Sequence, residues 1–164
     1  MARSFNADEP IAYFITWTTY GTWLPGDERG WHRENVPGVQ SGDSTRKHAA
    51  QLRMTDSAFV MSDLHRSIVE QTIRRHCEIR NWWPHAINPR TNHVHVVVSA
   101  PSYNPKIVRE QFQAWCTRML KRVVQDRVHF WTEGGSERYV NNETELERVV
   151  QYVLEAQDLK FLDE

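Results

Sequence analysis

The chain is short of the features that mark secreted and membrane-spanning proteins. It has two cysteines, Cys77 and Cys116, and no Cys-x-x-Cys pair, so we expect reduced thiols that act as small apolar side chains. It has no apolar run of membrane-spanning length. The first ten residues, MARSFNADEP, lack the basic and then apolar pattern of a secretory signal. We therefore expect a cytoplasmic protein that makes no contact with a membrane.

The chain also lacks a strong charge of one sign and any obvious linker. Its formal net charge of −1 argues against broad adhesion to nucleic acid but leaves room for local basic patches. No stretch rich in Pro, Gly or Ser divides the chain, and 164 residues suit one hydrophobic core. We predict a single domain over residues 1–164, with a long loop insertion at about residues 21–57, where Gly, Pro, Asp and Asn are frequent.

The most informative segment is residues 92–98, Asn-His-Val-His-Val-Val-Val, whose β-branched residues predict a strand. Successive side chains of a strand point to opposite faces, so His93 and His95 share one face and the alternate valines share the other. Two adjacent imidazoles provide half of a metal site, which needs a third ligand from elsewhere. A solvated face of a half-buried sheet would show the same pattern.

Periodicity and capping residues predict the other elements. Besides the strand at residues 93–100, strands are expected at residues 11–19 and 83–88, and a short helix near residues 45–52. Longer helices are expected from Ser62 to about Arg80, from Asn104-Pro105 through Val123, and from a capping box of Asn142 and Glu145 onward. Residues 128–131 and 137–140 flank two glycines and predict a short hairpin.

In the last predicted helix, Tyr152 lies outside the apolar stripe. That stripe consists of Leu146, Val149, Val150, Val153 and Leu154. At about 100° per residue the tyrosine is roughly 130° away from the stripe, so its hydroxyl faces water or a cleft. Arg148 and Glu155 lie towards the same side, whereas Gln157 projects near the stripe if the helix is regular.

Basic clusters and loop tryptophans are candidate contacts to nucleic acid. Arginines and lysines gather beside apolar positions at helical spacing, a pattern that solvated helix faces also show. The candidate DNA-binding residues from these clusters are Arg74, Arg75, Arg118, Lys121 and Arg122. Trp23 and Trp31 stand in loop-like sequence, where a flat ring suits stacking of an unpaired base as well as packing within the loop.

The order of these parts resembles the single-tyrosine HUH transposases. The order is strand, helix, hairpin with Asn-His-Val-His, long helix, short hairpin, and a last helix with Val-Val-Gln-Tyr-Val-Leu-Glu. The chain is most similar to the REP-associated tyrosine transposases, relatives of the smallest insertion-sequence transposases, over residues 11–157. The opening Ile-Thr-Trp-Thr-Thr-Tyr-Gly-Thr-Trp-Leu-Pro-Gly-Asp is similar to the first strand and loop of one subgroup.

The resemblance implies an α+β, ferredoxin-like fold, in which an antiparallel sheet carries the histidine pair on a central strand and the tyrosine helix crosses that face. It implies that His93 and His95 bind a divalent metal, Mg²⁺ or Mn²⁺, with histidine favouring manganese. Tyr152 is then the nucleophile that forms a covalent phosphotyrosine intermediate.

One position departs from the family pattern. The family commonly places Gln or Asn four residues after the tyrosine as a third metal ligand, and this chain has Ala156 there. Glu155 is the favoured substitute because it shares the tyrosine's side and carries a carboxylate, which suits Mg²⁺. Gln157 keeps the residue type and is the alternative.

The implied function is that of a metal-dependent single-stranded DNA endonuclease and strand transferase, a transposase acting on hairpin or palindromic repeat DNA. The residue at Ala156 and the near-neutral charge leave open a non-catalytic DNA-binding protein of the same fold. A small metal-dependent hydrolase in which Tyr152 takes no part is a third reading, and it predicts turnover without a protein–DNA adduct. The residues do not decide between a monomer and a homodimer in which the tyrosine helix serves the partner's histidines.

Overall fold

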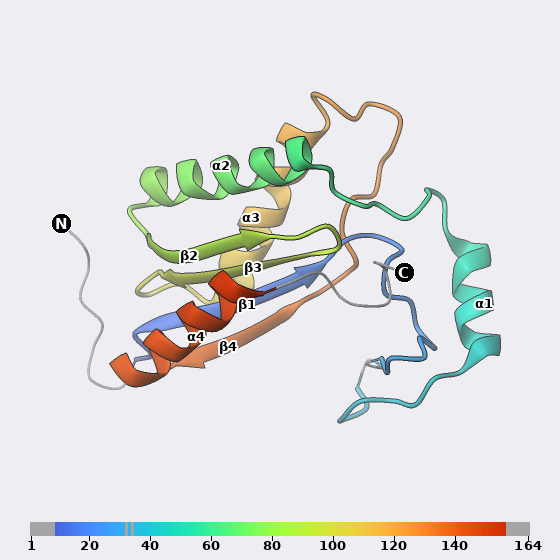
Figure 1. Ribbon diagram of the computed structural model, residues 1–164, viewed down its shortest axis with the longest axis horizontal. Coiled ribbons are helices and arrows are strands. Elements are labelled where there is room, and N and C mark those ends of the chain that lie inside the picture. Colours follow the sequence, from blue (N-terminus) through green and yellow to red (C-terminus); the bar gives the residue numbers. More distant parts are fainter. Residues whose placement is uncertain (1–8, 32, 34, 157–164) are drawn as a thin grey trace.

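A four-stranded antiparallel sheet forms the centre of the protein, as seen in a computed structural model that describes residues 9–31, 33 and 35–156 (Figure 1). The sheet has the order β2-β3-β1-β4. Its strands are β1 (Ala12–Thr18), β2 (Trp83–Pro89), β3 (His93–Ser99) and β4 (Ser136–Val140). The helices are α1 (Ser44–Arg53), α2 (Asp63–Arg80), α3 (Pro105–Leu120) and α4 (Glu143–Glu155). The predicted α+β fold is confirmed, and the histidine pair lies on β3, one of the two inner strands.

The two faces of the sheet are covered by different helices. In Figure 1, α4 lies in front of the sheet and α3 lies behind it. On the α2–α3 side, Val94, Val96 and Val98 of β3 belong to the larger hydrophobic core. On the α4 side, Val97 joins a smaller core that includes Val153 of the helix. The predicted alternation along β3 is therefore confirmed, with the histidines on the α4 side.

The helices begin where their capping residues predict. The Ser62 side chain accepts a hydrogen bond from the backbone N–H of His65 in the first turn of α2. The Asn104 side chain accepts one from the backbone N–H of Lys106 in the first turn of α3. At α4, Asn142 Oδ1 accepts from the Glu145 backbone N–H at 2.9 Å. Glu145 Oε2 in turn accepts from the backbone N–H of Asn141, one residue before the cap. The predicted extension of α3 through Val123 is wrong, because the helix ends at Leu120 and a turn follows.

The predicted hairpin between residues 128–131 and 137–140 is wrong. β4 pairs antiparallel with β1, with Phe14 opposite Arg138 and Ala12 opposite Val140. Trp131 instead forms an isolated bridge with Thr19. Pairing with β1 extends an existing sheet and buries Val140 to 1% exposure, which a two-stranded ribbon alone would not achieve.

Within the described residues, the insertion at 21–57 is folded against itself. It contains α1 and a backbone bridge between Trp31 and Gln40. Gly26 has a φ of +88°, and a Cβ there would meet the Asp43 carbonyl oxygen at 2.3 Å, so the turn requires glycine. Side-chain hydrogen bonds from the indoles of Trp23 and Trp31 to backbone carbonyls add to this order.

Both cysteines are buried, unbridged members of the larger core. Burial raises the pKa of the Cys77 thiol to about 12, and it also raises the pKa of Cys116. Neither thiol is a nucleophile near neutral pH. Among the described helices, none is long and apolar enough to cross a membrane.

Replacement of the α4 cap should loosen the helix that carries Tyr152. Asn142→Ala removes the acceptor for the Glu145 N–H, and we expect the free energy of unfolding to fall by about 1 kcal/mol. Urea denaturation followed by far-UV circular dichroism measures this. Asn142→Asp should retain most of the stability, and Thr144→Ala in the same exposed turn is the control. An Asn142→Ala protein as stable as the parent would contradict the cap's role.

Candidate functional site

The histidine pair is held by a side chain of the neighbouring strand β1 and by the residue that precedes β3. The rings of His93 and His95 are 4.5 Å apart between centroids and nearly perpendicular. Nδ1 of His93 is hydrogen-bonded to Asn92 Oδ1 at 2.6 Å, and Nδ1 of His95 to Thr16 Oγ1 at 2.8 Å. Thr16 is the register partner of His95 across β1 and β3. These bonds engage Nδ1 and leave the metal-ligand role to Nε2 in each ring.

The imidazoles are buried, which excludes a solvated sheet face. His93 and His95 are 3% and 7% exposed, because α4 lies over this side of β3. Burial, followed by the neighbouring His93, lowers the pKa of His95 to about 3. The neutral ring is the form that binds metals, and burial maintains it at neutral pH without competition from protonation.

Tyr152 lies beside the histidines on α4. Its ring centroid is 5.9 Å from that of His95 and 6.0 Å from that of Phe14. The tyrosine is nevertheless 59% exposed, whereas the next residue, Val153, is fully buried against the sheet. The sequence prediction that Tyr152 lies outside the apolar stripe is confirmed, and the phenol is accessible to a large substrate.

A cavity of about 450 Å³ joins these residues. It is lined by Thr16, Thr18, Trp23, His93, His95, Tyr152, Glu155 and Ala156. Glu155 is exposed, and its Oε1 accepts a hydrogen bond from Gln151 at 3.2 Å. The structure thus brings Glu155 to the same cavity as the histidines. Gln157, the alternative ligand, lies outside the described residues.

The donor set fits a divalent metal in part. Two buried imidazoles, each with Nδ1 hydrogen-bonded to an oxygen, have the chemistry of paired metal ligands. The Glu155 carboxylate lines their cavity. However, no group of three His, Cys, Asp or Glu side chains able to hold a metal is formed among the residues that the structure describes. The histidines therefore fit the ion, and the third ligand is a matter for experiment.

Asn88 is a positioning residue that the sequence analysis missed. It lies opposite His95 in the register of β2 and β3. Its amide Nδ2 donates to the backbone oxygen of Val153 at 2.7 Å and to that of Ala156 at 3.3 Å. Asn88 thereby ties the C-terminal end of the tyrosine helix to the strand beside the histidines. The signal available in the sequence was a polar amide side chain within a predicted strand. Thr16, a hydroxyl within the predicted strand at residues 11–19, gave a similar signal.

The candidate DNA-binding arginines of α2 and α3 lie on helices that cover the opposite side of the sheet. Arg74 and Arg75 form surface ion pairs with Glu70 and Glu78 on their own helix. The guanidinium of Arg118 lies over the Trp115 ring at 4.5 Å. Lys121 and Arg122 are exposed in the turn after α3. The structure does not bring these five residues to the histidine cavity.

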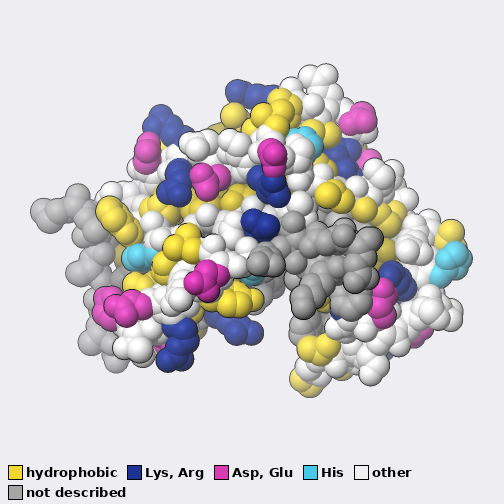
Figure 2. All heavy atoms as spheres, in the orientation of Figure 1, with side chains coloured by type: hydrophobic (Ala, Val, Ile, Leu, Met, Phe, Trp, Pro, Cys, Tyr) yellow, Lys and Arg dark blue, Asp and Glu magenta, His cyan; other side chains and the backbone are white. Residues whose placement is uncertain are grey.

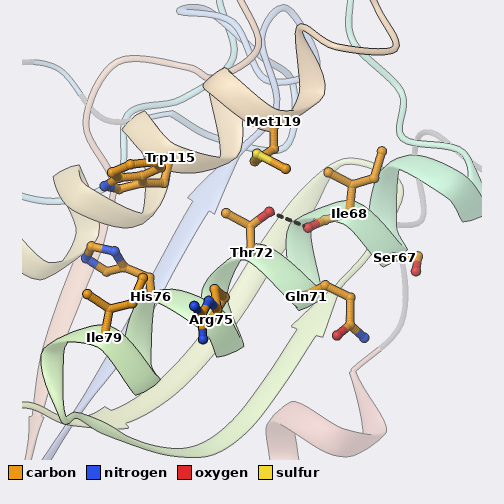
Figure 3. A pocket seen from close by; sticks show the side chains of 9 residues that line it. All are labelled: Ser67, Ile68, Gln71, Thr72, Arg75, His76, Ile79, Trp115 and Met119. Atoms are coloured by element: carbon orange, nitrogen blue, oxygen red, sulfur yellow. Dashed lines mark hydrogen bonds between the residues drawn. The ribbon is translucent and has the colours of Figure 1, made fainter.

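A second hollow, about 530 Å³, lies between α2 and α3 (Figure 3). Trp115 and Met119 of α3 face Ile68, His76 and Ile79 of α2 across it. Its polar groups are largely satisfied, since the Thr72 hydroxyl donates to the Ile68 carbonyl and His76 bonds to Gln111. This apolar hollow is separated from the histidine cavity by the sheet.

Comparison with known proteins agrees with this architecture. No family model matches the sequence, and no curated protein matches it. A solved structure from Deinococcus radiodurans, provisionally described as a transposase, aligns over 97% of this chain and 100% of its own at 11% identity, with a TM-score of 0.52. This chain shares its fold.

A second solved structure covers most of the chain. It is described as a REP-associated tyrosine transposase bound to a REP hairpin, and it aligns over 93% of this chain and 68% of its own. Its identity to this chain is 10% and the TM-score is 0.49. The fold that this chain shares with the Deinococcus structure agrees with the fold implied by the resemblance noted from the sequence.

Asn88 should control the order of the last turn of α4. Asn88→Asp keeps the size of the side chain but removes the N–H donor and sets an acceptor against two carbonyl oxygens. We expect stability to fall by about 1–3 kcal/mol, and amide hydrogen exchange to become faster around Val153. Glu147→Ala, an exposed change on the same helix away from its last turn, is the control. Unchanged exchange in Asn88→Asp would show that the apolar contacts of α4 suffice.

Proposed function

We propose that this protein is a metal-dependent single-stranded DNA endonuclease and strand transferase that uses Tyr152 as its nucleophile. The observation that carries the proposal is the 5.9 Å separation between the rings of Tyr152 and His95, on two elements far apart in the sequence. An accessible phenol beside two buried imidazoles combines a nucleophile with metal ligands in one cavity. The fold shared with the Deinococcus protein supports this reading.

In this proposal, Nε2 of His93 and Nε2 of His95 hold Mg²⁺ or Mn²⁺, and Glu155 or Gln157 supplies a third ligand. A bound cation would polarise the scissile phosphodiester and orient its leaving group. Asn92 Oδ1 can only accept, so it favours the tautomer of His93 that carries the proton on Nδ1, and Thr16 orients the ring of His95. Asn88 sets the end of α4, and hence Tyr152, against the metal-binding strand.

The covalent step conserves the energy of the broken bond. The Tyr152 hydroxyl loses its proton as its oxygen bonds to phosphorus, the bond between phosphorus and the 3′-oxygen breaks, and the 3′-oxygen takes up a proton and leaves as a free hydroxyl. The phosphodiester is then stored as phosphotyrosine. Attack by the same or another 3′-hydroxyl breaks the tyrosine–phosphorus bond and rejoins DNA without ATP. The exposure of Tyr152 gives a second strand end access to this intermediate.

The arrangement supports an active site within one chain. Tyr152 and His95 of the same molecule are already neighbours, and Asn88 holds the helix in this position. A dimer is therefore unnecessary for assembly of the cavity. We take hairpin or palindromic repeat DNA as the substrate, in line with the family that the sequence resembles. The basic residues of α2 and α3, Arg74, Arg75, Arg118, Lys121 and Arg122, are proposed contacts to phosphates outside the cavity.

A covalent adduct is the expected product. Purified protein, incubated with labelled hairpin oligonucleotides that carry single-stranded flanks and with Mn²⁺ or Mg²⁺, should give a slow-migrating protein–DNA band on a denaturing gel. Tyr152→Phe should abolish the band, because the phenol oxygen forms the bond. His93→Ala and His95→Ala should lower its yield at least a hundredfold.

Tyr139→Phe is the matched control, because Tyr139 is as exposed as Tyr152 and lies on β4 of the same sheet. It should form the adduct as the parent does. Binding without any adduct across a broad oligonucleotide pool would instead favour the non-catalytic DNA-binding protein. Cleavage that persists in Tyr152→Phe without an adduct would favour a metal-dependent hydrolase.

The third metal ligand is tested by replacing Glu155. We expect Glu155→Ala to weaken Mn²⁺ binding by about tenfold or more, since ligand shells of metal sites respond on this scale. Isothermal titration calorimetry measures the affinity without DNA. Glu147→Ala, an exposed carboxylate elsewhere on α4, is the control. Weaker binding in Gln157→Ala with unchanged binding in Glu155→Ala would transfer the role to Gln157.

A further inference from the structure

Two hollows meet at Tyr152. One is the histidine cavity, which reaches Trp23 on the loop after β1. The other is a groove of about 470 Å³ between β4 and α4, to which Arg138 and Arg148 contribute. Thr16, His95 and Tyr152 line both. The two hollows therefore adjoin at these residues, with the proposed nucleophile between an indole on one side and two arginines on the other.

The groove presents two available positive charges. Arg138 lies opposite Phe14 in the register of β1 and β4, so its side chain emerges on the α4 side of the sheet. Arg148 comes from α4, one turn before Tyr152. Both are exposed, and neither forms an ion pair with any described residue. Figure 2 shows Lys and Arg side chains at the lower edge of the molecule in this view, where β4 lies in Figure 1.

The acidic residue of the groove forms no ion pair with either arginine among the described residues. Glu145 lines the groove as well, but its carboxylate accepts from the Asn141 backbone N–H at 3.0 Å as part of the α4 cap. By contrast, Arg74 and Arg75 on the opposite side of the protein are each paired with a glutamate of their own helix. Within the described part of the chain, the two arginines beside Tyr152 thus have no carboxylate partner, whereas Arg74 and Arg75 each have one.

At the other end, a buried ion pair positions Trp23. Asp27 is 1% exposed, and its Oδ2 is 2.6 Å from Nη2 of Arg29. The guanidinium of Arg29 lies over the Trp23 ring, 4.0 Å from its centroid, and the indole N–H donates to the Gly30 carbonyl at 2.7 Å. A buried ion pair in a loop is costly to assemble and fixes its neighbours in one arrangement. Trp23 is therefore a pre-organised wall of the histidine cavity.

We propose that a single DNA strand crosses the site along these two hollows. On one side of the scissile phosphate, its backbone phosphates contact Arg138 and Arg148. On the other side, an unpaired base stacks on Trp23. Arginine binds phosphate oxygens through paired N–H groups, and aromatic rings accept bases of any identity. This path rests on the proposed function. It adds which side of Tyr152 contacts the phosphates of the strand and which side contacts an unpaired base.

The arginine end is tested by the salt dependence of binding. The probe is a fluorescein-labelled hairpin oligonucleotide with single-stranded flanks, in EDTA so that no cleavage occurs. Each phosphate contact to a single strand adds about 0.7 to the slope of log K against log salt. Arg138→Gln/Arg148→Gln should therefore make the slope shallower by about 1.4. Arg53→Gln/Lys106→Gln removes the same charge from exposed positions on α1 and α3 and should leave the slope unchanged.

The tryptophan end is tested with the same probe. Trp23→Ala should raise Kd by about tenfold or more through lost stacking, with the salt slope unchanged. Trp23→Phe should recover much of the affinity. Phenylalanine cannot donate to Gly30, so recovery reports the aromatic face and not the hydrogen bond. An unchanged slope in the arginine variant, an equal change in its control, or no recovery in Trp23→Phe overturns the path.

Adduct formation by the parent protein is read separately with Mn²⁺. If the parent forms the adduct while the arginine and tryptophan variants bind DNA as the parent does, the path is wrong and the activity stands. If the parent forms no adduct while these variants lose binding as described, the path is correct and the nuclease activity is wrong.

Discussion

The register of β3 against β1 is the constraint on which the site depends. β3 is buried on both faces, so its alternate side chains go to two different environments. Val94 and Val96 are fully buried in the larger core, while His93 and His95 meet α4. A shift by one residue would exchange the two sets. It would place imidazoles in an apolar core without hydrogen-bond partners, at a cost of several kcal/mol (about 2–7 per group). Core packing therefore fixes the orientation of the candidate metal ligands.

The same register supplies the partners that prepare the histidines for chemistry. Thr16 lies opposite His95 on one side and Asn88 on the other. Thr16 bonds to the ring itself, whereas Asn88 reaches past it to the end of α4. The position of Tyr152 is thus set from β2, and that of the imidazole from β1. Three neighbouring strand positions determine both halves of the proposed site.

Local signals in the sequence predicted the strand and the helix that carry the site. They did not predict how deeply the site is buried between these elements. The β-branched run after His93 predicted β3, and Asn142 with Glu145 predicted the start of α4, because alternation and capping act over a few residues. The sequence analysis paired residues 137–140 with the nearest strand-like segment, residues 128–131, whereas β4 pairs with β1. Strand pairing depends on contacts between residues distant in sequence, which local signals do not report. The depth of burial of His95 was missed for the same reason, because α4 provides it.

Burial and exposure are divided in a way that suits chemistry on a polymer. A histidine that binds a metal must be neutral, and burial of the candidate ligand His95 favours this form by lowering its pKa to about 3. A nucleophile for a DNA strand must instead be reachable from outside, as Tyr152 is. The net charge of −1 gives the protein no general attraction to DNA. The proposed recognition of DNA must then depend on local contacts. The residues able to provide them next to Tyr152 are Arg138 and Arg148, which have no ion-pair partner among the described residues, and the fixed ring of Trp23.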